Sequence, residues 1–468
     1  MMPTRIEHDF IGELEIPNDK YYGIQTFRAM DNFHITGVPL SVEPNFVVAL
    51  AYVKKAAANA NKDLGILDPK IAEAISFASD EIIKGKYHDQ FVTDLIQGGA
   101  GTSVNMNANE VIANIALEYM GHKKGEYKYC HPNNHVNMSQ STNDAYPTAF
   151  RIALLKSLDR YKESLNALSA SMKRKGEEFK DVLKMGRTQL QDAVPMSLGS
   201  EFHGWGTTIK EEIGRVDSAK NLIREINMGA TAIGTRVNAP EEYPELVTKY
   251  LIKYTGCPLF LADDLIEATS DTGAYVQLSG VLKRTAVKLS KISNDLRLLS
   301  SGPRTGLNEI NLPKMQPGSS IMPGKVNPVI PEVVNQVAFY VIGADTTVTM
   351  AAEAGQLQLN VMEPVISYSL FTSILYLTRA CDTLRTKAID GITANAEHTK
   401  NMVMNSVGIV TLLNPIIGYE ESSSIAKEAL NENKSVYEIA VKERKIITQE
   451  KWDELFRIEN LINPQFIL

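Results

Sequence analysis

Apolar side chains recur every three, four or seven positions through the middle of the chain, and this spacing predicts long helices. One run begins at Ile152 and extends to Phe179 through these apolar positions: Ile152, Leu155, Leu158, Tyr161, Leu165, Leu168, Met172 and Phe179. Because these positions share one helical face, they predict a helix of more than about 25 residues. A second run extends from Leu282 to Leu299 and is followed by the helix-breaking segment 300–303.

Two further helices are predicted over residues 331–353 and 364–388, with Pro331 and Pro364 in the first turns, where proline is tolerated. The first of these is apolar on almost every side. Its longest apolar stretch, from Val333 to Ala344, is too short to span a bilayer, which needs about 20 residues. A helix of this kind must be surrounded, so we expect it at the centre of an oligomeric helical bundle or against another subunit.

We therefore predict an all-α, mainly helical fold with three helical domains. A chain of 468 residues exceeds the size of a single hydrophobic core. Residues 1–140 are rich in Gly, Pro and Asn and predict short helices mixed with loops. Residues 141–395 hold the long helices of a central bundle, and residues 396–468 divide into shorter amphipathic pieces.

Composition narrows the function. The net charge of -7 supplies no basic stripe, so we expect neither nucleic acid nor a membrane as partner. Three widely spaced cysteines, Cys130, Cys257 and Cys381, fit neither a disulfide framework nor a zinc site. The first ten residues are too charged for a signal peptide. A reducing cytoplasm is the predicted location.

The segment GSSIMPGKVNP, residues 318–328, sets two serines, a lysine and an asparagine among four glycine or proline residues, and it predicts a mobile loop that carries chemistry. It is not a nucleotide-binding P-loop, because five residues separate Gly318 from Gly324, Val326 follows Lys325, and no strand is predicted before it. The alternative is a flexible connector whose serines cap the next helix.

Two other loops, GGAGTSVNMNAN at 98–109 and HPNNHVNMSQSTNDAYP at 131–147, are dense in neutral hydroxyl and amide groups, which recognise carboxylates. The alternative is ordinary capping and turn residues. In a fourth stretch, 186–195, Thr188 and Gln189 lie within a region otherwise predicted to be helical, so the alternative there is a solvated helix face. His131 and His135 lie four apart, but no carboxylate accompanies them, and a role in loop structure is favoured over metal binding.

The loops carry a family resemblance. The signature GSSxxPxKxN is matched at every fixed position from Gly318 to Asn327, and the segments YYGIQT (21–26), SGPRTGLNE (301–309) and NSVGIVTLLNP (405–415) extend the match along the chain. The sequence resembles the aspartase and fumarase superfamily over essentially its whole length. This resemblance implies three helical domains, a central five-helix segment that forms a twenty-helix core, and a homotetramer whose active sites each combine loops of three subunits.

Within the superfamily the chain looks like the ammonia-lyases that act on aspartate. It has GAGTSVNMN where fumarases have GSGTQSNMN, SQSTND where they have SQSSND, and GRTQLQDA where they have GRTHLQDA. After the signature it has NPVIPEVVNQV, which lacks the cysteine that fumarases carry there. Gln189 replaces a fumarase histidine, and a neutral amide accepts a hydrogen bond from an ammonium but cannot titrate to activate water. The implied reaction converts L-aspartate to fumarate and ammonia. The alternatives are a fumarate hydratase and a non-catalytic structural descendant.

The resemblance also implies roles for particular residues. Ser319 is the general base, acting as an alkoxide, Ser320 helps to hold the enediolate, and Lys325 stabilises the charge. The carboxylate beside the acidic proton is bound by Thr102, Ser141 and Thr142. Lys325 and Asn327 bind the other carboxylate, and the amino group is surrounded by Asn143, Thr188 and Gln189. No prosthetic group or metal is required, although a nonessential activation by Mg²⁺ is known in the family.

Overall fold

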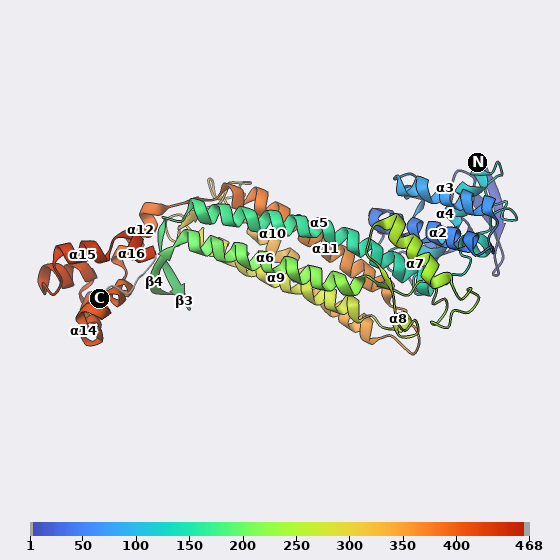
Figure 1. The fold of residues 1–468 in the computed structure, drawn as a ribbon. Helices are drawn as coiled ribbons and strands as arrows, with labels where there is room; N and C mark the ends of the chain where they lie inside the picture. The colour runs from blue at the N-terminus through green and yellow to red at the C-terminus, as the bar shows by residue number, and fades with distance from the viewer. Residues whose placement is uncertain (1–2, 463–468) are drawn as a thin grey trace. The chain divides into compact units, whose positions relative to one another are not determined.

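The computed structural model describes residues 3–462, and the fold is mainly helical, as predicted (Figure 1). The chain forms two compact units. The first comprises the described residues of Met1–Lys162 together with Gly214–Arg284 and Phe339–Leu377. The second comprises Glu163–Ile213, Thr285–Ala338 and the described residues of Thr378–Leu468. The division into three domains stays a prediction.

Five long helices run through the middle of the chain, and each contributes residues to both units. They are α5 (Thr142–Glu178), α6 (Leu198–Ile223), α9 (Gly273–Leu299), α10 (Val329–Glu353) and α11 (Glu363–Lys387). Helices α5, α9, α10 and α11 confirm the four helices predicted from apolar spacing. The ends of α10 and α11 lie within two residues of the prediction, whereas α5 and α9 begin ten and nine residues before the apolar runs at Ile152 and Leu282. Figure 1 shows these five helices with their labels.

The long helices pack as a bundle inside each unit. In the first unit the Phe150 ring of α5 lies 4.7 Å from the Tyr275 ring of α9 and 5.3 Å from the Phe371 ring of α11, measured between centroids. In the second unit Asn335 Nδ2 of α10 donates to Ser290 O of α9 across 3.1 Å. Apolar packing and buried, satisfied amides together fix how the helices face one another.

The remainder of the first unit is formed mostly by the first 140 residues. Its elements are β1 (Thr4–His8), β2 (Glu13–Pro17), α1 (Ile24–Asn32), α2 (Pro44–Asp63), α3 (Pro69–Ile83), α4 (Thr102–Tyr119), β5 (Glu225–Ile226), α7 (Tyr243–Thr255), β6 (Phe260–Leu261) and α8 (Glu267–Ser270). Strands β1 and β2 are antiparallel, β5 and β6 parallel. Helices α2 and α4, with 20 and 18 residues, are longer than the short helices expected here, because their apolar faces are buried against neighbouring helices.

The end of the second unit consists of short helices, as predicted. They are α12 (Ala396–Asn405), α13 (Asn414–Ile417), α14 (Tyr419–Glu432), α15 (Gln449–Leu455) and α16 (Ile458–Ile462), with the short strands β7 (Ile310–Asn311) and β8 (Thr393–Ala394) beside them. Their buried side chains form a separate hydrophobic cluster that includes Val403, Ile409 and Trp452.

The helical interpretation of residues 186–195 is wrong. This segment lies in an antiparallel hairpin of β3 (Leu183–Thr188) and β4 (Gln191–Ser197). Leu183 and Met185 point into the hydrophobic cluster of the short helices with the two-residue period of a strand. Gln189 and Leu190 form the turn with φ of +54° and +63°, a conformation that no helix contains.

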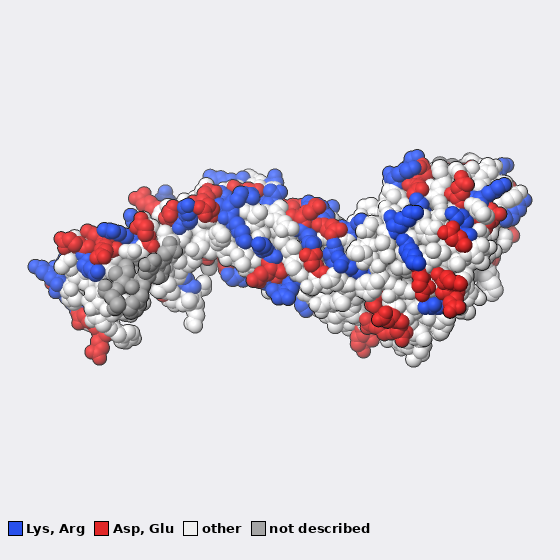
Figure 2. Space-filling view, viewed as in Figure 1, with Lys and Arg blue, Asp and Glu red and all other residues white. Residues whose placement is uncertain are grey.

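Charged side chains of both signs are interspersed over the face drawn in Figure 2, in keeping with the absence of a basic stripe in the sequence. Among residues 3–462, no helix has the length and apolarity needed to cross a membrane.

Several large apolar side chains of helix α10 are exposed to solvent. In the first unit Phe339 is 63% exposed and Met350 is 67% exposed, and Tyr340 is exposed beside Tyr376 of α11, with ring centroids 5.2 Å apart. Several large apolar side chains exposed along one helix are typical of a surface that another protein chain covers.

Candidate active site

Two segments predicted as loops become helical partway along, which corrects their extent. The 98–109 segment is a loop only up to Gly101, and Thr102 is the first residue of α4. The 131–147 segment includes the short helical turn Pro132–Val136 and then enters α5 at Thr142. The hydroxyl and amide residues therefore lie at two helix N-termini, where backbone N–H groups without helical partners favour an anion.

The first turns of α4 and α5 are joined by one hydrogen bond, from Asn105 Nδ2 to Thr142 Oγ1 across 3.2 Å. Because Thr142 Oγ1 accepts this bond, its own proton remains available to a carboxylate. Ser141 Oγ likewise accepts from the Asn143 backbone N–H at 3.2 Å. The Thr102 hydroxyl instead donates to Gly99 O at 2.7 Å, so it must rotate before it binds a ligand.

A buried lysine lies behind these turns, and the sequence analysis missed it. Lys54 Nζ donates to Asn105 Oδ1 at 2.6 Å, to Gln140 Oε1 at 2.9 Å and to Asn137 Oδ1 at 3.0 Å. All three ammonium protons are thereby used, while burial lowers the pKa of Lys54 to about 7. A lysine on an otherwise apolar helical face was the only signal in the sequence.

Asp144 is a second buried charge at the start of α5. Its carboxylate accepts from the backbone N–H groups of Ser141 at 2.9 Å, Gly229 at 3.1 Å and Thr231 at 2.9 Å. Burial raises the pKa of Asp144 to about 7. The carboxylate thus ties the Ser141–Thr142 turn to the 229–231 segment.

Asn143, in the first turn of α5, is held by hydrogen bonds to the 227–232 segment. Its Nδ2 donates to Ala232 O at 2.7 Å, and its backbone oxygen accepts from Asn227 Nδ2 at 3.0 Å. The side-chain oxygen of Asn143 is therefore the atom of this amide that can accept a hydrogen bond from an amino group.

His131 and His135 serve the loop itself. His131 Nδ1 accepts from Asn133 N at 3.0 Å, and His135 Nδ1 accepts from His131 N at 2.9 Å. Burial lowers the pKa of both imidazoles. Both imidazoles therefore take part in the hydrogen bonding of the loop.

The signature loop 318–328 is closed at its base. Gly318 N donates to Lys325 O at 2.7 Å, and Asn327 Nδ2 donates to Gly318 O at 2.8 Å. A side chain at Gly318 would collide with this closure, since a Cβ there would lie 2.8 Å from Asn327 N and 2.9 Å from Lys325 O. The base of the loop therefore requires glycine at its first position.

Within the closed loop, Ser319 Oγ accepts from two backbone N–H groups, Ile321 at 3.2 Å and Met322 at 3.1 Å. Two donors aimed at one hydroxyl oxygen favour its deprotonated form. Ser319 is half-buried, whereas Ser320 and Lys325 are exposed. The hydroxyl is thus bonded to the backbone of its own loop rather than to the N-terminus of α10, and it is arranged to carry negative charge.

Thr188 and Gln189 lie at the exposed end of the β3–β4 hairpin. The structure therefore groups the predicted site residues by segment. Thr102, Ser141, Thr142 and Asn143 lie in the first unit, and Thr188, Gln189, Ser319, Ser320, Lys325 and Asn327 lie in the second. The described contacts join Thr142 to Asn105 at the α4 turn, but they do not join the hairpin tip to the signature loop.

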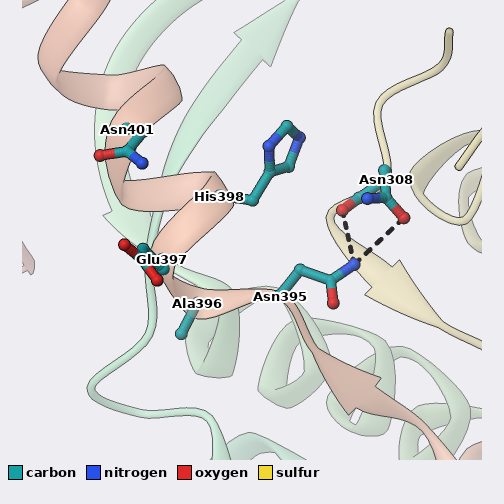
Figure 3. A pocket seen from close by; sticks show the side chains of 6 residues that line it. All are labelled: Asn308, Asn395, Ala396, Glu397, His398 and Asn401. Atoms are coloured by element: carbon teal, nitrogen blue, oxygen red, sulfur yellow. Dashed lines mark hydrogen bonds between the residues drawn. The ribbon is translucent and has the colours of Figure 1, made fainter. Parts of the chain in front are cut away.

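A polar hollow of about 490 Å³ lies beside the segment that leads to the signature loop (Figure 3). Asn395 Nδ2 donates to Asn308 O at 2.8 Å and to Asn308 Oδ1 at 3.1 Å, and the other lining residues are Ala396, Glu397, His398 and Asn401. None of the predicted site residues is among them. These bonds hold the 301–311 segment against the start of α12.

Similarity to a known protein family identifies the chain as a lyase. A family model described as lyase matches residues 12–343, and a model of the fumarase C C-terminus matches residues 409–463. The chain belongs to the aspartase and fumarase superfamily, which confirms the resemblance seen in its loops.

Individual relatives are similar along nearly the full chain. Aspartate ammonia-lyase of Helicobacter pylori is 61% identical over 98% of both chains, and aspartate ammonia-lyase of Escherichia coli K12 is 58% identical over 99% of this chain and 97% of its own. Among solved structures, fumarate lyase:delta crystallin from Brucella melitensis bound to cobalt superimposes with a TM-score of 0.95 at 52% identity, covering 98% of this chain and 99% of its own. Class II fumarase from Schistosoma mansoni has a TM-score of 0.93 at 34% identity, covering 99% of this chain and 100% of its own.

Proposed function

We propose that this chain is an aspartate ammonia-lyase, which reversibly eliminates ammonia from L-aspartate to give fumarate. The observation that carries the proposal is the identity of 58 to 61% to proteins of that name over nearly the whole chain. The solved fumarase is more distant, at 34% identity, and Gln189 stands where a fumarase has histidine.

The difficult step is removal of a weakly acidic proton from the carbon beside a carboxylate. Ser319 Oγ takes this proton as an alkoxide, and the substrate becomes an enediolate. The N–H groups of Ile321 and Met322 hold the negative charge on Ser319 Oγ. The ammonium of Lys325, in the same loop, adds a positive charge, and Ser320 helps to hold the enediolate.

Negative charge grows on the carboxylate beside the acidic carbon, so that carboxylate needs donors that strengthen in the transition state. Ser141 and Thr142 offer hydroxyl protons from the N-terminus of α5, and Thr102 offers one from the N-terminus of α4. The helix ends add their partial positive charge. Hydrogen bonds from neutral donors strengthen as this charge grows, so they stabilise the transition state more than the bound substrate.

The remaining residues bind the other end of the substrate. Lys325 pairs with the second carboxylate, and Asn327 contributes the second proton of its Nδ2, since the first closes the loop. Asn143 Oδ1, Thr188 and Gln189 surround the amino group. Because an amine leaves without strong acid assistance, neutral groups are sufficient there.

The active form is proposed to be a homotetramer with a core of twenty helices, five from each chain. The exposed Phe339, Tyr340 and Met350 of α10 support this, because they need an apolar cover. The exposed positions of Thr188, Gln189 and Lys325 support active sites that combine loops of three subunits. Three buried free thiols, Cys130, Cys257 and Cys381, suit a reducing cytoplasm.

The scheme requires no prosthetic group. Every step is assigned to side chains and backbone N–H groups of the chain, so turnover should survive removal of divalent cations with EDTA. A nonessential Mg²⁺ activation would appear as a partial loss that added Mg²⁺ restores. Complete loss restored by a metal would overturn this part of the proposal.

The test is the initial rate of fumarate formation from L-aspartate, with Ser319→Ala in parallel and L-malate as the comparison substrate. We expect turnover of aspartate, little turnover of malate, and a loss of about 10²–10⁴-fold or more in the variant. Circular dichroism and light scattering should show that Ser319→Ala keeps its helices and assembly. Turnover of malate alone would indicate a fumarate hydratase, and silence with both substrates a non-catalytic descendant.

A further inference from the structure

Buried charges lie at the base of the β3–β4 hairpin, and the proposed mechanism leaves them without a role. The Glu309 side chain is 1% exposed, the Lys184 side chain 4% and the Arg187 side chain 13%. Buried charges are costly unless paired, so each should have a compensating partner.

Glu309 is the centre of this cluster. One carboxylate oxygen accepts from Arg187 Nη1, and the other lies 3.0 Å from Lys184 Nζ, which also contacts Glu201. The backbone of Glu309 is fixed on both sides, because its N–H donates to Leu299 O at 2.8 Å and its oxygen accepts from Asn395 N at 2.9 Å. The carboxylate is therefore presented by a rigid segment.

The hairpin reaches from this anchor to its tip in very few residues. Leu183 and Met185 are fixed in the hydrophobic cluster of the short helices, and Arg187 directly precedes Thr188. On the opposite strand Asp192 pairs with Arg187 in the ladder and accepts from Ser406 Oγ at 2.7 Å. Thr188 and Gln189 thus extend from a base that Arg187 and Glu309 lock in place.

The charges at the base of the hairpin do not cancel. Lys184 and Arg187 supply two positive charges, and Asp192, Glu201 and Glu309 supply three negative charges, so the base of the hairpin carries a net charge of -1. The adjoining pair Lys291–Asp295 adds nothing to the balance. Asp192 is exposed and Glu201 partly buried, whereas Glu309 is buried, so the charge of Glu309 itself is screened less than a surface charge.

We propose that Glu309 is a positioning residue for the amino group of the substrate. Its ion pair with Arg187 holds Thr188 and Gln189 in place, and its charge keeps the hairpin base negative, which favours a cationic ammonium at the tip. This inference rests on the proposed function, since it takes the tip as the amine site.

The reverse reaction separates this role from a purely structural one. Fumarate and ammonia are bound by different groups of the proposed site, so their KM values report on different ends. Loss of the Glu309 charge should raise KM for ammonium and leave KM for fumarate unchanged. A variant that is only less stable would contain less active protein and would lower kcat with both KM values unchanged.

The experiment compares Glu309→Gln and Glu309→Asp with the wild-type tetramer, at constant ionic strength while ammonium chloride is varied. For Glu309→Gln we expect KM for ammonium to rise roughly three- to tenfold. Glu309→Asp retains the charge and should stay within about twofold of the wild type in that constant. The matched control is Glu212→Gln, which removes an equally buried carboxylate that pairs with Lys288 in the same unit, away from the hairpin.

An unchanged KM for ammonium in Glu309→Gln, or an equal rise in the fumarate KM, would overturn the inference. So would the same rise in Glu212→Gln. Should Glu309→Gln not fold, Arg187→Lys tests the contact from its more exposed side: the charge is kept and the Nη1 hydrogen bond to Glu309 is lost. Thr188 and Gln189 should then be less well held, so KM for ammonium should rise while KM for fumarate stays unchanged. An unchanged KM for ammonium in Arg187→Lys would count against the proposal. Wild-type protein that ignores aspartate in the parallel assay marks failure of the proposed function instead.

Discussion

Asn105 Nδ2 donates to Thr142 Oγ1 across 3.2 Å, and this bond connects the first turn of α4 to the first turn of α5. The other end of the same amide accepts from Lys54 Nζ at 2.6 Å. One buried asparagine therefore orients a hydroxyl of the proposed carboxylate site and satisfies a buried ammonium.

Asn105→Ala should lower both stability and activity. Lys54 loses an acceptor and Thr142 loses the donor that orients it, so we expect the free energy of unfolding to fall by about 1–3 kcal/mol. The value of kcat/KM for aspartate should fall by about tenfold, which corresponds to about 1.4 kcal/mol of transition-state binding. Urea denaturation and initial rates measure the two effects.

The matched control is Asn45→Ala, which removes an exposed amide bonded to Ser157 Oγ at 3.0 Å. Its effect on unfolding should stay within about 0.5 kcal/mol. Equal effects from the two substitutions would show that the buried bond has no special role.

Asp144 should make stability depend on pH. Burial raises its pKa from 3.8 to about 7, so between about pH 4 and 7 the folded state holds a proton that the unfolded state has lost. The free energy of unfolding should therefore fall as pH rises through this window, by up to about 1.4 kcal/mol per pH unit. Asp144→Asn should reduce this slope but not abolish it, because burial also raises the pKa of Glu110 to about 7 and that of Glu363 to about 8. The exposed control Asp31→Asn should keep the full slope.

Lys54 acts in the opposite direction at higher pH. Its pKa is lowered from 10.5 to about 7, so between these values the unfolded state binds the extra proton and stability rises with pH. Denaturation curves from pH 4.5 to 9.5, at one protein concentration, measure both limbs. Parallel curves for the wild type and Asp144→Asn would contradict the first assignment.

Gly101→Ala should damage the start of α4. Gly101 has a φ of +92°, and a Cβ there would lie 2.3 Å from the buried Tyr146 ring. Backbone strain and the clash together should cost about 2–4 kcal/mol. KM for aspartate should rise because Thr102 follows directly.

Gly121→Ala separates these two causes. Gly121 has a similar φ of +83°, but a Cβ there would meet nothing within 4 Å, so only strain of about 1 kcal/mol is expected. Thermal unfolding of the two variants measures the difference. The same loss in both would mean that the Tyr146 contact is irrelevant.

Phe339→Asp should dissociate the assembly and abolish turnover together. A carboxylate on the bare face of α10 cannot be buried against another chain without a large penalty. Light scattering should report smaller species, while circular dichroism keeps the helical signal. Leu430→Asp, at a similarly exposed apolar position on α14, is the control and should remain assembled. Full activity in a demonstrated Phe339→Asp monomer would refute the composite site.

The long helices could be predicted because their apolar residues recur at regular spacing along one face of each helix. α5 and α9 depend on apolar positions only three, four or seven residues apart. The β3–β4 hairpin could not be predicted in this way, because its turn is Gln189–Leu190 rather than a pair that contains asparagine or glycine. Nor did the sequence show that the asparagines of α4 are helical, since their partners lie on distant segments.

The candidate site shows the same division. Ser319 and Lys325 could be named because they lie within one short signature. Lys54, by contrast, meets Asn137 only after folding brings together residues 83 positions apart, and Glu309 meets Arg187 across 122 positions. Contacts between residues so far apart leave no local pattern in the sequence. The buried charges that support the site could therefore be identified only from the structure.

The turn at Gln189 and Leu190 has a consequence for laboratory evolution. Both residues adopt a left-handed conformation that glycine or asparagine would adopt at lower cost. Selection for thermostability alone should therefore accept glycine at either position. Selection that also demands deamination should accept it only at 190, where no substrate contact is proposed. The hairpin turn thus exchanges stability against activity at position 189 but not at position 190. Sequencing the surviving variants at these two codons would show this difference.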